Sequence, residues 1–138
     1  MCAARRPIRI LIVDDEEPIL HFVQRVLRDD GYETVAASNP ETALTLATGE
    51  GPFALLLTDL VMPNVPGDEL ARRLRRDQPD LKVLYLTGYS DRLFESRLLL
   101  WESESFLDKP ASAKALREAV SLALFGHTHG PQSGESHA

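Results

Sequence analysis

The chain has 138 residues, 43% of them hydrophobic, enough for one globular domain that buries a core without disulfides or structural metal. Fifteen Lys and Arg residues against twenty-one Asp and Glu residues give a net charge of -6, which argues against direct nucleic-acid binding. The single cysteine, Cys2, excludes an internal disulfide, and no apolar stretch approaches the roughly 20 residues of a membrane span. We therefore expect a cytoplasmic protein that does not bind membranes.

The first strand and helix are predicted close to the start of the chain. Residues 1–7 are expected to form an N-terminal lead, and residues 8–125 one domain. Ile8–Val13 is an apolar run typical of a buried strand, and Pro18–Arg28 has helical spacing, with Gly31 past its end. The apolar positions expected on the inner face of this helix are Ile19, Phe22, Val23, Val26 and Leu27.

Two further strand and helix pairs follow. Thr34–Ala37 is a short strand, and the Asn-Pro-Glu tripeptide at Asn39 has the N-cap, early proline and early acid of a helix that runs to about Thr48. Phe53–Thr58 lacks polar alternation, as expected for a central strand covered on both faces. Asp68–Arg76 is the next predicted helix, with its arginines on a solvated face.

The last two pairs complete a repeated pattern. Lys82–Thr87 and Ser105–Asp108 are predicted strands, while Asp91–Trp101 and Ala113–Phe125 are predicted helices. Residues 126–138 are expected to be a disordered tail. Five alternating pairs predict a doubly wound α/β fold, a three-layer sandwich in which helices cover both faces of a five-stranded parallel sheet.

Polar residues stand where several of these strands end. They are Asp14 and Asp15 after the first strand, Asp59 at the third, Thr87 at the fourth and Lys109 after the fifth. Open α/β folds place their ligands at the carboxyl edge of the parallel sheet, so we expect these side chains to meet there. Three carboxylates in one pocket repel one another unless a cation lies among them, and oxygen ligands of this kind suit Mg²⁺.

This set of residues is suited to phosphoryl transfer, which needs alignment and charge stabilisation more than covalent help. Asp59 is the expected nucleophile, Lys109 is expected to hold one phosphoryl oxygen, and the Thr87 hydroxyl another. Taken alone, an Asp after a strand is more often a helix cap or a turn residue, and Lys109 would be an ordinary loop lysine. Their occurrence together favours the functional interpretation.

Two other functional classes remain as alternatives. Aspartyl phosphatases of the haloacid dehalogenase type also use an Asp nucleophile with Mg²⁺, but they need two aspartates separated by one residue, and here Asp14 and Asp15 adjoin. A flavin-binding, flavodoxin-like protein needs a phosphate loop rich in Ser, Thr and Gly. The acidic run from Asp14 to Glu17 would instead repel a phosphate.

The residues resemble the CheY-like receiver domain of two-component response regulators over Ile8–Phe125. The motifs that carry the resemblance are Val13–Glu16, Asp59–Pro63 with Gly67, Leu86–Tyr89 and Phe106–Pro110. The segment Leu84–Asp91 is similar to receivers attached to hybrid histidine kinases. The resemblance implies a signalling phosphoprotein in a phosphorelay, whose only catalysis is its own phosphorylation and dephosphorylation.

The family resemblance implies the sheet order 2-1-3-4-5 and a phosphoryl group on Asp59, delivered by a sensor histidine kinase or a histidine phosphotransfer protein. It implies that Asp15, Asp59 and the Val61 carbonyl hold Mg²⁺, with Asp14 acting through water. It also implies a cis peptide bond before Pro110, which proline makes accessible.

The resemblance further implies a conformational switch in which Thr87 and Phe106 move inward together and alter the face of the fourth helix, fifth strand and fifth helix. A downstream protein would bind that face, which would also serve a homodimer. In the family, the positions of Val61 and Tyr89 flank the path of the attacking water, so we expect these two residues to lengthen the lifetime of the phosphoryl group. The chain departs from the family before the fifth strand, where Leu99–Ser105 replaces a small Gly-Ala turn, and at Ala111, where a large apolar residue is usual.

Overall fold

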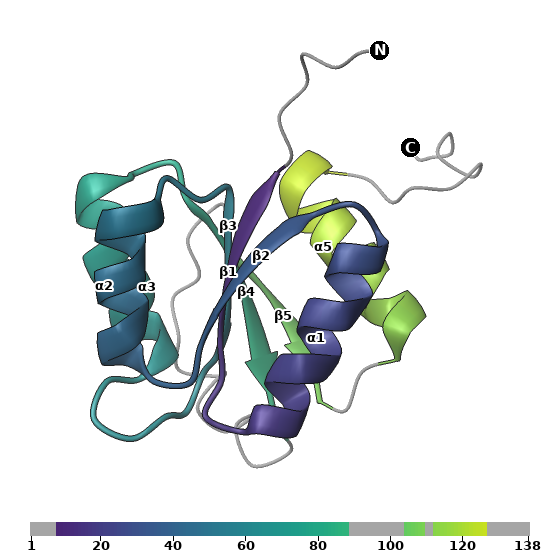
Figure 1. The fold of residues 1–138 in the computed structure, drawn as a ribbon, viewed down its shortest axis with the longest axis horizontal. Helices are drawn as coiled ribbons and strands as arrows, with labels where there is room; N and C mark the ends of the chain where they lie inside the picture. Colours follow the sequence, from purple (N-terminus) through teal and green to yellow (C-terminus); the bar gives the residue numbers. More distant parts are fainter. Residues whose placement is uncertain (1–7, 89–103, 110–111, 127–138) are drawn as a thin grey trace.

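The computed structural model describes residues 8–88, 104–109 and 112–126. Its strands form one parallel sheet in the order β2-β1-β3-β4-β5, which confirms the doubly wound α/β fold (Figure 1). The strands are β1 (Arg9–Val13), β2 (Glu33–Ala37), β3 (Leu55–Asp59), β4 (Lys82–Thr87) and β5 (Glu104–Asp108). The helices are α1 (Glu17–Asp29), α2 (Pro40–Glu50), α3 (Gly67–Asp77) and α5 (Ala113–Phe125).

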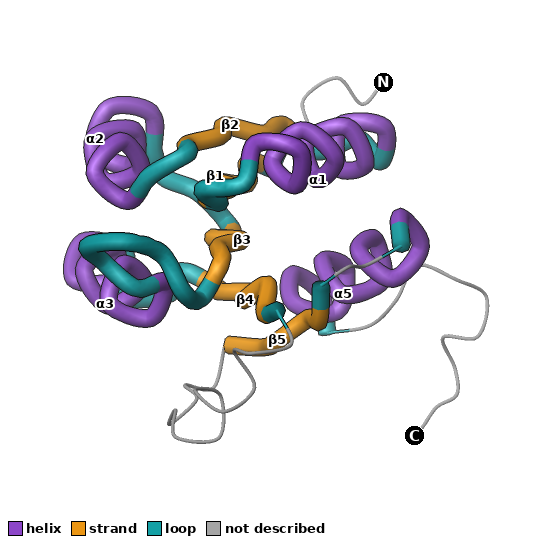
Figure 2. Tube along the Cα trace, turned by 90° about the horizontal axis from the view of Figure 1, so that it is seen from below, coloured by secondary structure: helices purple, strands orange, loops and turns teal. Residues whose placement is uncertain are grey.

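Helices cover both faces of the sheet, because right-handed crossovers that run along the sheet in opposite directions place their helices on opposite sides. Figure 2 shows α1 and α5 on one face and α2 and α3 on the other, with the strands between them. Neighbouring residues of a strand point to opposite faces, so Ile10 and Ile12 of β1 join the core under α1 and α5, while Leu11 joins the core under α2 and α3. Every residue of β3 is buried, as a central strand requires.

The inner face of α1 differs from the expected one at Phe22 and Leu20. Phe22 is 39% exposed, whereas Leu20, which the sequence pattern did not place inside, is buried together with Val23, Val26 and Leu27. A helix turns about 100° per residue, so Leu20, Val23 and Leu27 share one stripe and Phe22 falls beside it. The expectation for Phe22 was therefore wrong.

The ends of the other elements follow local hydrogen bonding. Asn39 Oδ1 accepts from the Thr42 N–H at 2.7 Å and begins α2, as its sequence predicts. The third strand begins at Leu55 rather than Phe53, because the Gln78 side chain takes both backbone groups of Phe53. Lys82 Nζ donates to the Leu124 carbonyl at 2.9 Å and ties β4 to the last turn of α5.

Some expectations fall outside the described residues. They are the N-terminal lead 1–7, the helix over 91–101, the segment before the fifth strand at 99–103, the tail from 127 and the cis bond before Pro110. Within the described ranges, no helix has the length and apolar character needed to cross a membrane.

Candidate functional site

The three predicted carboxylates meet at the carboxyl edge of the sheet. Asp14 directly follows β1, and Asp59 ends β3, its neighbour in the sheet. Oxygen atoms of Asp14, Asp15 and Asp59 all lie within 4.8 Å of one another. Asp14 is fully buried and Asp59 nearly so, while Asp15 is exposed, so the cluster has a buried floor and one acid at its mouth.

Lys109 supplies the positive charge of this cluster. It follows β5, and its Nζ lies 3.0 Å from Asp14 Oδ2 and 3.5 Å from Asp59 Oδ2. Burial opposes its charged form, but the carboxylates of Asp14, Asp59 and Glu16 outweigh that effect and raise the pKa of Lys109 above its usual value. The lysine is therefore a fixed cation held against both buried acids.

The buried Asp14 has two partners that hold its charge in place. Its Oδ1 accepts from the Glu16 N–H at 2.8 Å, and its Oδ2 faces Lys109. Burial nevertheless raises the pKa of Asp14, because these two interactions compensate only part of the lost hydration. Further positive charge near Asp14 would therefore favour its ionised form.

The loop after Asp59 is held against β4 and closed on itself by backbone hydrogen bonds. The Leu60 N–H donates to the Leu86 carbonyl at 3.2 Å, and the Gly67 N–H donates to the Leu60 carbonyl at 2.7 Å. A Cβ atom at Gly67 would lie 2.2 Å from the Asp59 carbonyl oxygen. Only glycine fits this approach, so Gly67 fixes the backbone of Asp59, while Val61 stays exposed at the rim.

The remaining predicted site residues are placed in part. Thr87 ends β4 opposite Asp108 of β5, and its side chain is outside the described part of the structure. Phe106 lies half-buried on β5 with its ring centroid 5.2 Å from that of Tyr85. Tyr89 and Pro110 belong to the undescribed segments.

Glu16 is a neighbour of the site for which the sequence analysis predicted no role of its own. Its Oε2 lies 3.9 Å from Lys109 Nζ. Glu16 belongs to the motif Val13–Glu16, but it is one of four consecutive acids and an acid is common before a helix, so the sequence did not indicate this contact. Gly67 also belongs to a predicted motif, but the steric need for glycine there depends on a contact with Asp59 that only the structure shows.

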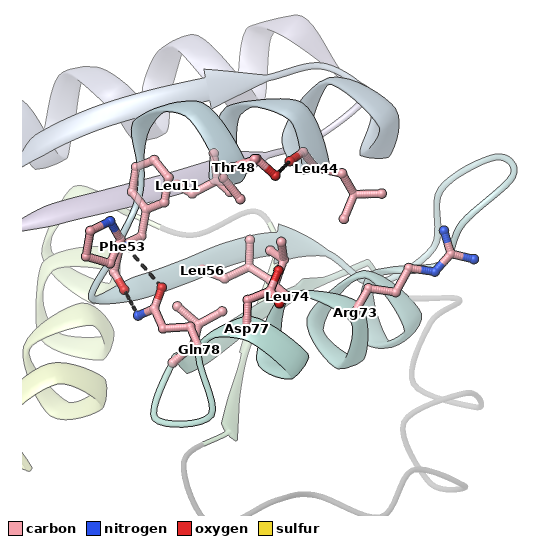
Figure 3. Close-up of a pocket in the computed structure, with 12 residues that line it drawn as sticks. Leu11, Leu44, Thr48, Phe53, Leu56, Arg73, Leu74, Asp77 and Gln78 are labelled. Carbon is pink, nitrogen blue, oxygen red and sulfur yellow. Dashed lines mark hydrogen bonds between the residues drawn. The ribbon is translucent and has the colours of Figure 1, made fainter.

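A separate pocket of about 350 Å³ lies between α2 and α3 and contains none of the clustered acids (Figure 3). Its walls are mainly apolar and include Leu11, Leu44, Leu56 and Leu74. The Gln78 amide, which faces this pocket, is already bonded to the backbone of Phe53. Its charged lining residues are Arg73 and Asp77, so it lacks the convergent carboxylates of the acidic cluster.

The fold and the site together define a class. A doubly wound parallel sheet with three acids and a lysine at its carboxyl edge is the architecture of a phosphoacceptor signalling domain. Residues 10–121 match the family described as the response regulator receiver domain. The chain belongs to this family, as the sequence motifs had indicated.

Relatives of known name support the same assignment. The chain is 40% identical over 82 residues to the response regulator receiver protein CpdR of Brucella abortus, covering 59% of this chain and 68% of CpdR. It is 33% identical over 112 residues to the sensor kinase CckA of the same organism, covering 80% of this chain and 12% of CckA. A response regulator receiver protein and a sensor kinase are thus both similar to this chain, which spans only a small part of the sensor kinase.

A solved structure is similar over nearly the whole described domain. The response regulator protein TrrA of Thermotoga maritima, in complex with Mg²⁺ and a beryllium fluoride, is 34% identical, with a TM-score of 0.73. The match covers 85% of this chain and 99% of that one. The similarity extends the family assignment to the three-dimensional fold.

Proposed function

We propose that Asp59 accepts a phosphoryl group from a sensor histidine kinase or a histidine phosphotransfer protein in a Mg²⁺-dependent reaction. The observation that supports this most directly is the position of Lys109 Nζ, 3.5 Å from Asp59 Oδ2 and 3.0 Å from Asp14 Oδ2. A cation fixed beside a nearly buried carboxylate can hold a phosphoryl oxygen while the carboxylate attacks phosphorus.

The residues present fit a Mg²⁺ ion. Three carboxylates within 4.8 Å offer hard oxygen ligands, and the buried Asp14 gains from added positive charge. We assign the metal to Asp14, Asp15, Asp59 and the Val61 carbonyl, with TrrA as a related protein solved with Mg²⁺. The bound ion would neutralise the acids and the charge that develops on the phosphoryl oxygens.

The transfer itself is a displacement at phosphorus. A carboxylate oxygen of Asp59 forms the new O–P bond while the P–N bond to the donor histidine breaks. The electron pair of that bond stays on the imidazole nitrogen. The imidazole takes up a proton from solvent and thereby leaves as a neutral group. Lys109 holds one oxygen of the transferred group, and the Thr87 hydroxyl is assigned to another.

The output of the domain follows from the same assignment. Thr87 and Phe106 would move toward the phosphoryl group and change the face of the fourth helix, β5 and α5. That face would bind a downstream protein or a second copy of the chain, without direct contact to nucleic acid. Val61 and Tyr89 would shield the phosphoryl group from water, and hydrolysis by the domain itself would end the signal in the cytoplasm.

Intact mass spectrometry tests the assignment of Asp59. We expect acetyl phosphate with Mg²⁺ to add one phosphoryl group to the wild-type protein and none to Asp59→Asn. Asp77→Asn, an exposed acid at the end of α3, is the matched control and should react like the wild type. Phosphorylation of Asp59→Asn at the wild-type rate would contradict the proposal, as would its absence in the wild type with both acetyl phosphate and a phosphorylated histidine kinase.

A further inference from the structure

Glu16 stands at the mouth of the acidic cluster without belonging to it. Its side chain is 61% exposed, and its Oε2 lies 3.9 Å from Lys109 Nζ. Lys109 Nζ in turn lies 3.5 Å from Asp59 Oδ2. The distance from Glu16 Oε2 to Asp59 Oδ2 therefore cannot exceed the sum of these two distances. The three acids that share one cluster are Asp14, Asp15 and Asp59, so Glu16 is an additional charge near the reacting oxygen.

The backbone of Glu16 is anchored, which keeps this charge at the mouth. Its N–H donates to Asp14 Oδ1 at 2.8 Å, and its carbonyl accepts from the Leu20 N–H at 3.1 Å in the first turn of α1. The side chain therefore starts from a fixed point beside the site. Its separation from Asp59 is shorter than the Debye length of about 8 Å at physiological ionic strength, so an anion approaching Asp59 feels its charge.

We propose that Glu16 is a specificity-determining residue that discriminates between phosphodonors by their charge. This deepens the proposed function and rests on it. The carboxylate repels a small dianionic donor and competes with a phosphoryl oxygen for Lys109. A phosphohistidine carried by a docked protein overcomes the repulsion, since docking supplies binding energy that a small donor lacks. Among small donors, the site therefore favours those that carry less negative charge.

The test compares two donors with two variants. Acetyl phosphate is a dianion at neutral pH and phosphoramidate is mainly a monoanion; rate constants are measured by intact mass at saturating Mg²⁺. Glu16→Gln should raise the rate constant about fivefold for acetyl phosphate and about twofold for phosphoramidate at low ionic strength. Both gains should shrink toward unity at roughly 0.5 M salt. Glu17→Gln removes the same charge one residue further along and should change the rates by less than about 1.5-fold.

The outcomes separate failure of this inference from failure of the proposed function. If Glu16→Gln behaves like Glu17→Gln, slows the reaction, or gives a gain that does not depend on salt, Glu16 does not discriminate by charge. If the wild-type protein accepts no phosphoryl group from either donor or from a phosphorylated kinase, the proposed function itself fails, and this inference with it.

Discussion

Gly67→Ala should disturb the site, because the added methyl group would collide with the backbone of Asp59. The new Cβ would lie 2.2 Å from the Asp59 carbonyl oxygen and 3.1 Å from the Leu60 Cα. Relieving an overlap of about 1 Å requires the backbone on one side to move, because both neighbours are main-chain atoms. The shift would strain or break the 2.7 Å hydrogen bond from Gly67 to Leu60.

The magnitude follows from these contacts. Overpacking costs about 1–3 kcal/mol, and a lost backbone hydrogen bond about 1 kcal/mol, so we expect the free energy of unfolding to fall by about 2–4 kcal/mol. A displacement of Asp59 by about 1 Å should also slow phosphorylation by about 100-fold. Urea unfolding followed by circular dichroism gives the first quantity, and intact mass with acetyl phosphate gives the second.

Gly49→Ala is the matched control for Gly67→Ala. Gly49 lies inside α2, and a Cβ there would meet no heavy atom within 4 Å. Alanine should therefore leave the phosphorylation rate unchanged and stabilise the protein by about 0.5–1 kcal/mol, through its helix propensity. If the free energy of unfolding and the phosphorylation rate of Gly67→Ala both equal those of the wild type, the close approach to Asp59 does not constrain the site, and the reasoning is refuted.

Three further predictions concern other parts of the domain. Asp15→Asn removes repulsion within the acidic cluster and should raise the melting temperature measured without Mg²⁺. It should also abolish the further rise that Mg²⁺ gives, whereas the control Glu17→Gln should keep that rise. An unchanged response to Mg²⁺ in Asp15→Asn would contradict this prediction. Asn39→Ala removes the N-cap of α2 and should cost about 1 kcal/mol in urea unfolding; a loss below about 0.3 kcal/mol would show that the bond contributes little. Leu116 lies on the buried face of α5, and Leu116→Ala should lower the free energy of unfolding by about 2–5 kcal/mol. Leu122 is 51% exposed, and Leu122→Ala should lower it by less than about 0.5 kcal/mol. Equal losses would refute the orientation of α5.

Much of the fold was predictable because each element carries its own local signal. The apolar run of β3 and the Asn39 cap of α2 depend on neighbours in sequence, and both elements formed where expected, with small shifts at the ends. Phe22 was misplaced because its burial depends on the angle at which α1 meets the sheet. Because a helix turns about 100° per residue, an error of one residue in choosing the buried face assigns a side chain to the wrong side of the helix.

The meeting of the acids was predictable from topology, whereas the contacts around them were not. Parallel strands bring their carboxyl ends to one edge, and that alone gathers Asp14 and Asp59. The contact of Glu16 with Lys109 joins segments far apart in the chain, and the steric demand at Gly67 depends on how the loop after Asp59 folds back on it. Both residues lie in the predicted motifs, but these contacts appear only once the tertiary structure is known.

The order in which the charges of the site occur along the chain has a consequence for its synthesis. Asp14, Asp15 and Asp59 leave the ribosome before Lys109, which lies beyond β5. A nascent chain that ends within β4 therefore has the acids but not the ammonium that faces two of them in the finished domain. Mutual repulsion at the β1 and β3 ends would oppose their early closure.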